Sequence, residues 1–172
     1  MTPLRRLGLV LFALLLPLDL LADETQKYRS FDGKLEALVI PVGGAAVERR
    51  ESRVEIRDSG GNVLLSRSFA SQDGKNGFIV YRVAWTPDSQ FFVFSVYSSG
   101  GHEFWQFPIY FYSRKDRRLR LLDDYVGPVT DPDFEIVAPD LVRTFRIKSY
   151  DNFDPVAVEA KLSNILKQKP KR

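Results

Sequence analysis

The most regular pattern of apolar and polar positions lies in Val83–Asp124, where aromatic-rich apolar runs alternate with short polar turns. Runs of this kind, bounded by Gly, Pro, Asp and Ser, predict β-strands joined in a meander. The strands predicted in and just before this region are Phe78–Trp85, Phe91–Ser98, Phe104–Ser113 and Leu119–Leu122. In the second and third of them both sets of alternate residues are largely apolar. We therefore expect a sheet that is covered on both faces over its middle strands.

Shorter apolar runs on either side predict further strands. They are Leu35–Val42, Val54–Arg57, Val63–Phe69, Phe134–Ala138 and Leu141–Lys148. Near the end, Asp154 and Pro155 are residues typical of a helix start. One helical face after them would carry Val158, Leu162, Ile165 and Leu166. The pattern predicts an all-β fold of antiparallel meanders, with a β domain over residues 23–153 and an amphipathic helix with a basic tail over residues 154–172.

A short turn motif recurs ahead of apolar strands. Its copies are Phe31-Asp32-Gly33-Lys34, Pro87-Asp88-Ser89-Gln90 and Pro139-Asp140-Leu141. Asp-Gly and Asp-Ser favour the tight reversals that pair neighbouring strands. The strand after each of the first two copies ends at a double glycine, Gly43-Gly44 and Gly100-Gly101. The repeated unit is therefore expected to be a small antiparallel sheet.

The segment Ala84-Trp85-Thr86-Pro87-Asp88-Ser89-Gln90-Phe91, followed by a glycine turn and Ile109-Tyr110-Phe111-Tyr112, resembles a blade of the WD40-like, TolB-type β-propellers. In that family a Trp-Ser-Pro-Asp-Gly segment joins two strands; Thr86 and Ser89 stand here in place of the Ser and the Gly. Closed propellers contain roughly four to eight blades, more than the two or three partial units of this chain can supply. The resemblance implies blade-like repeats packed as a sandwich or partial propeller, or several chains that assemble.

Composition narrows the choice of partner and chemistry. The formal net charge is +3, from 25 Lys and Arg against 22 Asp and Glu, and the excess is spread along the chain. A nucleic-acid site is therefore not expected. The chain has no cysteine, which excludes disulfides, zinc thiolates and a thiol nucleophile.

The N-terminus has the pattern of a secretory signal peptide over residues 1–22. Two arginines precede the apolar run Leu7–Leu16, and cleavage is expected after the small residue Ala22. The alternative is an uncleaved membrane anchor, but Pro17 and Asp19 shorten the apolar run below the roughly 20 residues that span a bilayer. We expect an exported protein, periplasmic or extracellular, with no stable membrane span once the signal is removed.

No sequence motif assigns a catalytic residue, a cofactor or a metal. The single histidine, His102, lies in a polar turn, where a structural role is expected. A loop rich in carboxylates offers oxygen atoms of the kind that Ca²⁺ prefers, although their spacing matches no EF-hand. The carboxylates are Asp123, Asp124, Asp131 and Asp133. Aspartate is common in turns, so these residues are not predicted to be metal ligands.

One face of the strand Phe104–Ser113 mixes polar and aromatic residues as protein interfaces often do. The possible interaction face consists of Trp85, His102, Gln106, Tyr110 and Tyr112. We expect it to meet a partner, whether a protein or a small ligand, or the C-terminal helix. An oligomer is possible.

These observations predict a non-catalytic binding or interaction module in the cell envelope or outside the cell. The alternative is a carboxylate-based hydrolase or carbohydrate-active enzyme. Its candidate residues are Asp88, Glu103, Asp123 and Asp131. A pair of them roughly 5 to 10 Å apart in one cleft would favour the enzyme.

Overall fold

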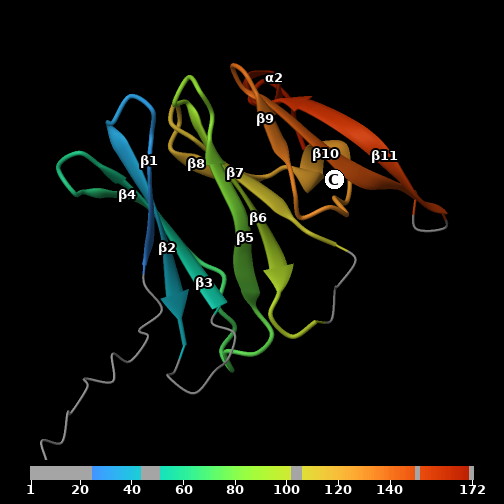
Figure 1. Cartoon of the computed structure of the whole chain (residues 1–172), viewed down its shortest axis with the longest axis horizontal. Helices are drawn as coiled ribbons and strands as arrows, with labels where there is room; N and C mark the ends of the chain where they lie inside the picture. The colour runs from blue at the N-terminus through green and yellow to red at the C-terminus, as the bar shows by residue number, and fades with distance from the viewer. Residues whose placement is uncertain (1–24, 44–50, 102–105, 150–151, 171–172) are drawn as a thin grey trace, which may run out of the picture.

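The computed structural model describes residues 25–43, 51–101, 106–149 and 152–170. Three antiparallel sheets follow one another along the chain, and the second lies between the other two (Figure 1). They are named here the first, central and third sheets. The predicted all-β fold of antiparallel meanders is confirmed, with helix restricted to two short segments in the described residues.

The first sheet is a four-stranded meander in which each strand pairs with the next. Its strands are β1 (Gln26–Arg29), β2 (Leu35–Val42), β3 (Glu51–Asp58) and β4 (Val63–Ser68). The β3–β4 turn shows how the polar turn residues act. The Asp58 carboxylate accepts hydrogen bonds from the N–H groups of Gly60 and Asn62, both at 2.9 Å. The turn therefore satisfies its own backbone donors with a local side chain.

The central sheet is the second four-stranded meander. Its strands are β5 (Phe78–Trp85), β6 (Phe91–Ser98), β7 (Ile109–Ser113) and β8 (Arg118–Leu121), and the short helix α1 (Asp123–Val126) follows them. Every residue of β6 from Phe91 to Val96 is buried, so the prediction of a sheet covered on both faces is confirmed. The third predicted strand starts later than expected, directly after Pro108, whose missing N–H cannot join the ladder.

The two faces of the central sheet enter two separate cores. Toward the first sheet, Phe92, Phe94 and Val96 pack with Val54 and Ile56. Toward the third sheet, the alternate residues of the same strands pack with residues of β10, β11 and α2. That second core includes Phe91, Val93, Ile109, Phe111, Val142, Ala160, Leu162 and Ile165. The period-two alternation of β6 and β7 thus holds three sheets together.

The recurring turn motif takes one geometry at its first two copies. The Ser30 hydroxyl donates to the Asp32 carboxylate over 2.8 Å and accepts from the N–H of Leu35 over 3.0 Å. The Thr86 hydroxyl, at the equivalent position, donates to the Asp88 carboxylate over 2.6 Å. The two sheets therefore begin their second strands from the same kind of side-chain-stabilised turn.

These two turns also contact each other. The Ser89 hydroxyl accepts a hydrogen bond from the N–H of Asp32 at 3.0 Å, and the Arg114 guanidinium lies 2.5 Å from the Asp32 carboxylate. Close by, the indole N–H of Trp85 donates to the carbonyl of Tyr28 at 2.9 Å. The repeat thus supplies polar contacts between the first and central sheets at one end of their shared core.

The third sheet has three strands in the order β11-β10-β9. They are β9 (Glu135–Val137), β10 (Leu141–Ser149) and β11 (Asn152–Lys161), and helix α2 (Leu162–Ile165) follows. Asp140, in the third copy of the turn motif, bonds to α2: its carboxylate accepts from the N–H of Ser163 at 2.8 Å and its carbonyl from that of Leu162 at 3.0 Å. This copy therefore fastens the end of the chain to the sheet.

The predicted helix over residues 154–172 is wrong in its extent, because the chain remains in β11 as far as Lys161. The residues after Pro155 alternate with period two: Val156, Val158 and Ala160 are less exposed than Ala157, Glu159 and Lys161. This alternation outweighs the helix-start signal of Asp154 and Pro155. Because β11 is an edge strand, Pro155 is tolerated there, and the β domain extends beyond residue 153.

Candidate binding cleft between the central and third sheets

The residues of the predicted interaction face lie in different environments. Trp85 and Tyr112 are 6% and 0% exposed in the core between the first and central sheets, and Tyr110 packs against the same core. Gln106 is half-buried and His102 lies outside the described residues. Trp85, Tyr110 and Tyr112 thus pack toward the first sheet. Two of the five predicted residues have almost no surface to offer a partner.

The carboxylates named for a hydrolase are also separated. Asp88 lies in the turn before β6 and borders a different cavity from the one that Asp131 lines. Asp123, at the start of α1, lines neither of these two cavities and accepts hydrogen bonds from two backbone N–H groups. Glu103 lies outside the described residues. Asp88 and Asp131 therefore line different cavities, and Asp123 lines neither of them.

Asp123 is nevertheless an unusual carboxylate. Burial raises its pKa, and hydrogen bonds from the N–H groups of Val129 and Ile109, at 3.1 and 3.2 Å, offset this effect only in part. A further hydrogen bond comes from the side-chain amide of Gln106 at 3.4 Å. The group ties α1 to the start of β7, a position that joins elements rather than one that faces a ligand.

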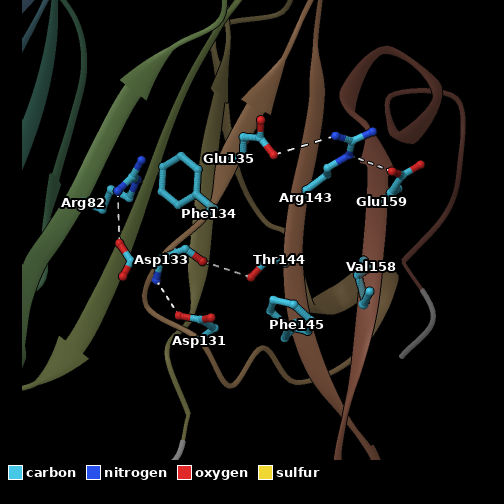
Figure 2. Close-up of a pocket in the computed structure, with 11 residues that line it drawn as sticks. Arg82, Asp131, Asp133, Phe134, Glu135, Arg143, Thr144, Phe145, Val158 and Glu159 are labelled. Carbon is cyan, nitrogen blue, oxygen red and sulfur yellow. Dashed lines mark hydrogen bonds and ion pairs between the residues drawn. The ribbon is translucent and has the colours of Figure 1, made fainter.

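A cavity of about 400 Å³ lies between β5 of the central sheet and the strands of the third sheet (Figure 2). Its lining comes from β5, from the segment before β9 and from all three strands of the third sheet. The lining residues are Arg82, Asp131, Asp133, Phe134, Glu135, Arg143, Thr144, Phe145, Ala157, Val158 and Glu159. The size is that of a site for a small ligand or a short peptide segment.

Ion pairs connect the elements around this cleft. Nη1 of Arg82 lies 3.0 Å from the Asp133 carboxylate and so links β5 to the segment before β9. Arg143, on β10, lies between Glu159 of β11 at 2.7 Å and Glu135 of β9 at 3.7 Å (Figure 2). The hydrogen bond to Glu159, with that residue's negative charge, raises the pKa of Arg143. The polar rim of the cleft is therefore largely organised before any ligand binds.

Apolar side chains lie among these charges. The Phe134 ring is buried, and the Arg82 guanidinium lies 5.5 Å from its centroid, which is the geometry of a cation–π contact. Phe145 is 45% exposed, unusual for a large apolar side chain. Ala157 and Val158 complete the apolar lining. The cleft thus offers both apolar surface and charge to a ligand.

The charge of the lining is negative. Four carboxylates stand against two guanidinium groups, which leaves an excess of two negative charges. Among the described residues, Asp131 forms no ion pair, and its carboxylate accepts a hydrogen bond from the N–H of Asp133 at 2.9 Å. Asp131 is therefore the carboxylate best placed to receive a cation from a ligand.

The described part of the chain contains no cluster of three or more His, Cys, Asp or Glu residues that could hold a metal ion. Within the same residues, no helix has the length and apolar character needed to cross a bilayer. The cleft therefore offers a ligand charged groups and apolar surface.

The sequence singles out Asp131 and Asp133 of the cleft as possible calcium ligands, and Asp131 also as a candidate hydrolase carboxylate. Arg82, Arg143 and Glu159 occupy exposed positions of strands, where charged residues are the norm. The sequence does not distinguish Phe145 from a core residue, because the alternation of its strand puts it on one face with Leu141 and Ile147.

Comparison with protein families, with curated proteins and with solved structures finds nothing that matches this chain.

Proposed function

We propose that this protein is an exported, non-catalytic binding module whose cleft between the central and third sheets holds a cationic ligand with an apolar group, such as a basic peptide segment. The observation that carries the proposal is the combination of exposed Phe145 with an excess of carboxylates in one cavity. A basic peptide would place an apolar side chain on Phe145 and a Lys or Arg near Asp131. Both contacts use groups that the protein leaves partly unsatisfied.

Binding is better supported than carboxylate catalysis. Hydrolysis of a glycosidic bond needs two carboxylates with different roles on either side of that bond. In this cleft Asp133, Glu135 and Glu159 are all ion-paired with arginines, an arrangement that suits recognition of charge. The other described hydrolase candidates, Asp88 and Asp123, lie elsewhere.

Export and the likeness to propeller blades belong to the same proposal. Export is supported by the pattern of residues 1–22, which lie outside the described residues. The blade likeness is supported by consecutive antiparallel meanders and by the shared turn geometry around Asp32 and Asp88. Mass measurement of the protein recovered from an exporting bacterial host tests export: a mature chain that begins at Asp23 is expected, and a retained leader would contradict it.

The binding proposal is tested with a fluorescein-labelled peptide that alternates Lys and Phe, titrated with the purified protein and followed by fluorescence anisotropy. An otherwise identical peptide with Glu in place of Lys is the ligand control. We expect saturable binding of the basic peptide only. Phe145→Ser should weaken it about fivefold by removing apolar contact area, and Asp131→Asn about threefold by removing an exposed charge pair.

Tyr81→Ser is the matched control variant, because Tyr81 is also an exposed aromatic residue, 55% exposed on β5, but does not line the cleft. This variant should bind the basic peptide as the original protein does. If the Phe145→Ser and Asp131→Asn variants bound the basic peptide as tightly as the original protein does, the binding site would lie elsewhere and the proposal would be overturned.

A further inference from the structure

A second hollow, of about 540 Å³, lies between β4 of the first sheet and β8 of the central sheet. Both strands stand at the edge of their sheets, and neither pairs with the other. The residues that line it are Leu65, Ser66, Arg67, Tyr110, Arg117, Arg118, Leu119, Arg120 and Leu121. This hollow, named here the edge groove, is on the opposite interface of the central sheet from the cleft.

The β8 side of the edge groove has free backbone groups. Among the described strands, β8 pairs with β7 alone, and just beyond its end the N–H of Leu122 donates to the carbonyl of Ile109 at 2.7 Å. Antiparallel ladders alternate, so every second residue of β8 bonds inward to β7. The N–H and C=O groups of Leu119 and Leu121 therefore point to the open side. An extended chain laid along β8 would find a row of unpaired donors and acceptors.

The charge of the edge groove is strongly positive. Four arginines line it, and no carboxylate does. Arg120 is ion-paired with Asp116. In the described residues, no ion pair forms at Arg67, Arg117 or Arg118. Three guanidinium groups are thus available to a ligand, whereas both arginines of the cleft are ion-paired.

The apolar lining has the alternation of a strand surface. Leu119 and Leu121 lie opposite Tyr112 and Tyr110 in the β7–β8 register and share their face of the sheet. Arg118 and Arg120 therefore alternate with them on the other face. A strand added to β8 would place one set of side chains beside arginines and the next set beside leucines.

We propose that the edge groove binds an extended acidic segment of a partner protein, which adds to β8 as a further antiparallel strand. Acidic side chains of the segment lie on the face of Arg118 and Arg120, where Arg118 has no ion-pair partner among the described residues, and apolar side chains lie opposite Leu119 and Leu121. Arg67 of β4 lies across the groove on the leucine side, and its positive charge adds to the attraction for an acidic segment without pairing with one carboxylate. Peptide addition to an open sheet edge combines backbone hydrogen bonds with selective side-chain contacts. A nucleic acid or an anionic lipid surface would use the arginines but not the free backbone groups.

The probe is a short fluorescein-labelled peptide that alternates Glu and Val, titrated with the purified protein. We expect saturable binding that weakens with added salt, because the contacts are between exposed charges. The same peptide with Gln for Glu should lose most of its affinity. N-methylation of every second amide, on the edge that would pair with β8, should weaken binding about fivefold per lost hydrogen bond.

Protein variants test the same contacts from the other side. Arg67→Gln and Arg118→Gln should each weaken binding about threefold. Leu121→Pro removes one outward N–H and should weaken binding about fivefold. Lys115→Gln is the matched control: it also removes an exposed positive charge near β8, but Lys115 does not line the groove, so affinity should stay unchanged.

The proposal is overturned if the N-methylated peptide binds as tightly as the unmodified one, because strand addition would then be absent. It is also overturned if single-stranded DNA or vesicles containing anionic lipid bind more tightly than the acidic peptide with the same dependence on Arg67 and Arg118. Because the N-methylated peptide leaves the protein unaltered, the proposal stays testable even if the Leu121→Pro variant fails to fold.

Discussion

The two faces of the central sheet form interfaces of different character. Both cores contain aromatic side chains, among them Phe92 and Phe94 toward the first sheet and Phe91 and Phe111 toward the third. Hydrogen-bonded turns join the two sheets at one end of the first core. Beside the second core, the edge is an open cleft lined with ion pairs. We call the first interface the fixed joint, because hydrogen-bonded turns hold its two sheets together. The second interface leaves charged and apolar surface available to a ligand.

A buried carboxylate beside each interface shows the same contrast. Glu51, fully buried beside the first interface, accepts hydrogen bonds from the N–H of Ser71 at 2.7 Å, from the hydroxyl of Ser99 at 2.6 Å and from the N–H of Gly77. Burial alone would raise its pKa, but the hydrogen bonds outweigh burial and lower it. Asp123, beside the second interface, accepts longer hydrogen bonds of 3.1 to 3.4 Å that do not offset burial, and its pKa is raised. Shorter hydrogen bonds thus distinguish the buried carboxylate beside the first interface from the one beside the second.

The largest expected effect comes from emptying either core. Phe94 and Phe111 are both fully buried, on opposite faces of the central sheet. Phe94→Ala and Phe111→Ala should each lower the free energy of unfolding by about 4 kcal/mol, because both leave a cavity in a packed core. Urea unfolding followed by tryptophan fluorescence and by circular dichroism measures the loss. Phe31→Ala, at a residue 72% exposed, is the control and should change little.

A much smaller loss for Phe111→Ala than for Phe94→Ala would mean that the third sheet packs more weakly than the first. Two separate transitions in the Phe111→Ala variant would show that the third sheet unfolds on its own. Either result would sharpen the contrast between the interfaces into a difference in stability.

The next largest effect is expected at the fixed joint. A Cβ atom at Gly77 would come within 2.4 Å of the Phe69 carbonyl oxygen and 2.6 Å of the Glu51 side chain. Gly77→Ala should therefore cost about 3 kcal/mol of unfolding free energy, measured in urea, because backbone and a buried carboxylate must both move. Gly60→Ala is the control, since the nearest atoms there are side-chain atoms at 3.3 Å. If Gly77→Ala and Gly60→Ala both changed the unfolding free energy only slightly, the fixed joint would be packed more loosely than its hydrogen bonds indicate.

The two buried carboxylates should give opposite dependences on pH. The pKa of Glu51 in the folded state is below its ordinary value of 4.5, so its stabilising contribution is present above that value and is lost as the pH falls through the folded pKa. The pKa of Asp123 is above its ordinary value of 3.8, so its contribution is present below that value and is lost as the pH rises through the folded pKa.

Urea unfolding between about pH 3 and pH 7 tests both signs. Glu51→Gln should remove part of the acid-side loss of stability and cost about 2 kcal/mol at neutral pH, because an amide nitrogen then faces backbone donors. Asp123→Asn should remove part of the loss of stability that occurs as the pH rises. If both variants altered the pH profile in the same direction, the contrast between the two carboxylates would be wrong.

The fold was more predictable than the cleft, for a physical reason. The alternation of Phe91–Val96 specifies two buried faces locally, and Asp32 and Asp88 specify turns within a few residues. The segment from Asp154 carried two competing local signals, and the pairing of β11 with β10 decided between them. The cleft depends on long-range pairing, as when Arg82 meets Asp133, and no short-range pattern distinguishes such residues from ordinary exposed charges.

The smallest expected effect concerns the ion pair at the open edge. Arg82→Gln breaks the ion pair with Asp133. Because the Arg82 and Asp133 side chains are 49% and 58% exposed, the loss should be about 0.5 kcal/mol of unfolding free energy at low salt. The loss should shrink in roughly 0.5 M NaCl, because salt screens exposed charges. Arg114→Gln is the matched comparison, since Arg114 and Asp32 are only 27% and 31% exposed and join the first and central sheets, so its loss should be larger and less sensitive to salt. If Arg82→Gln instead cost as much as Phe111→Ala, the edge would hold the third sheet in place, and the cleft would be a joint rather than a surface left open for a ligand.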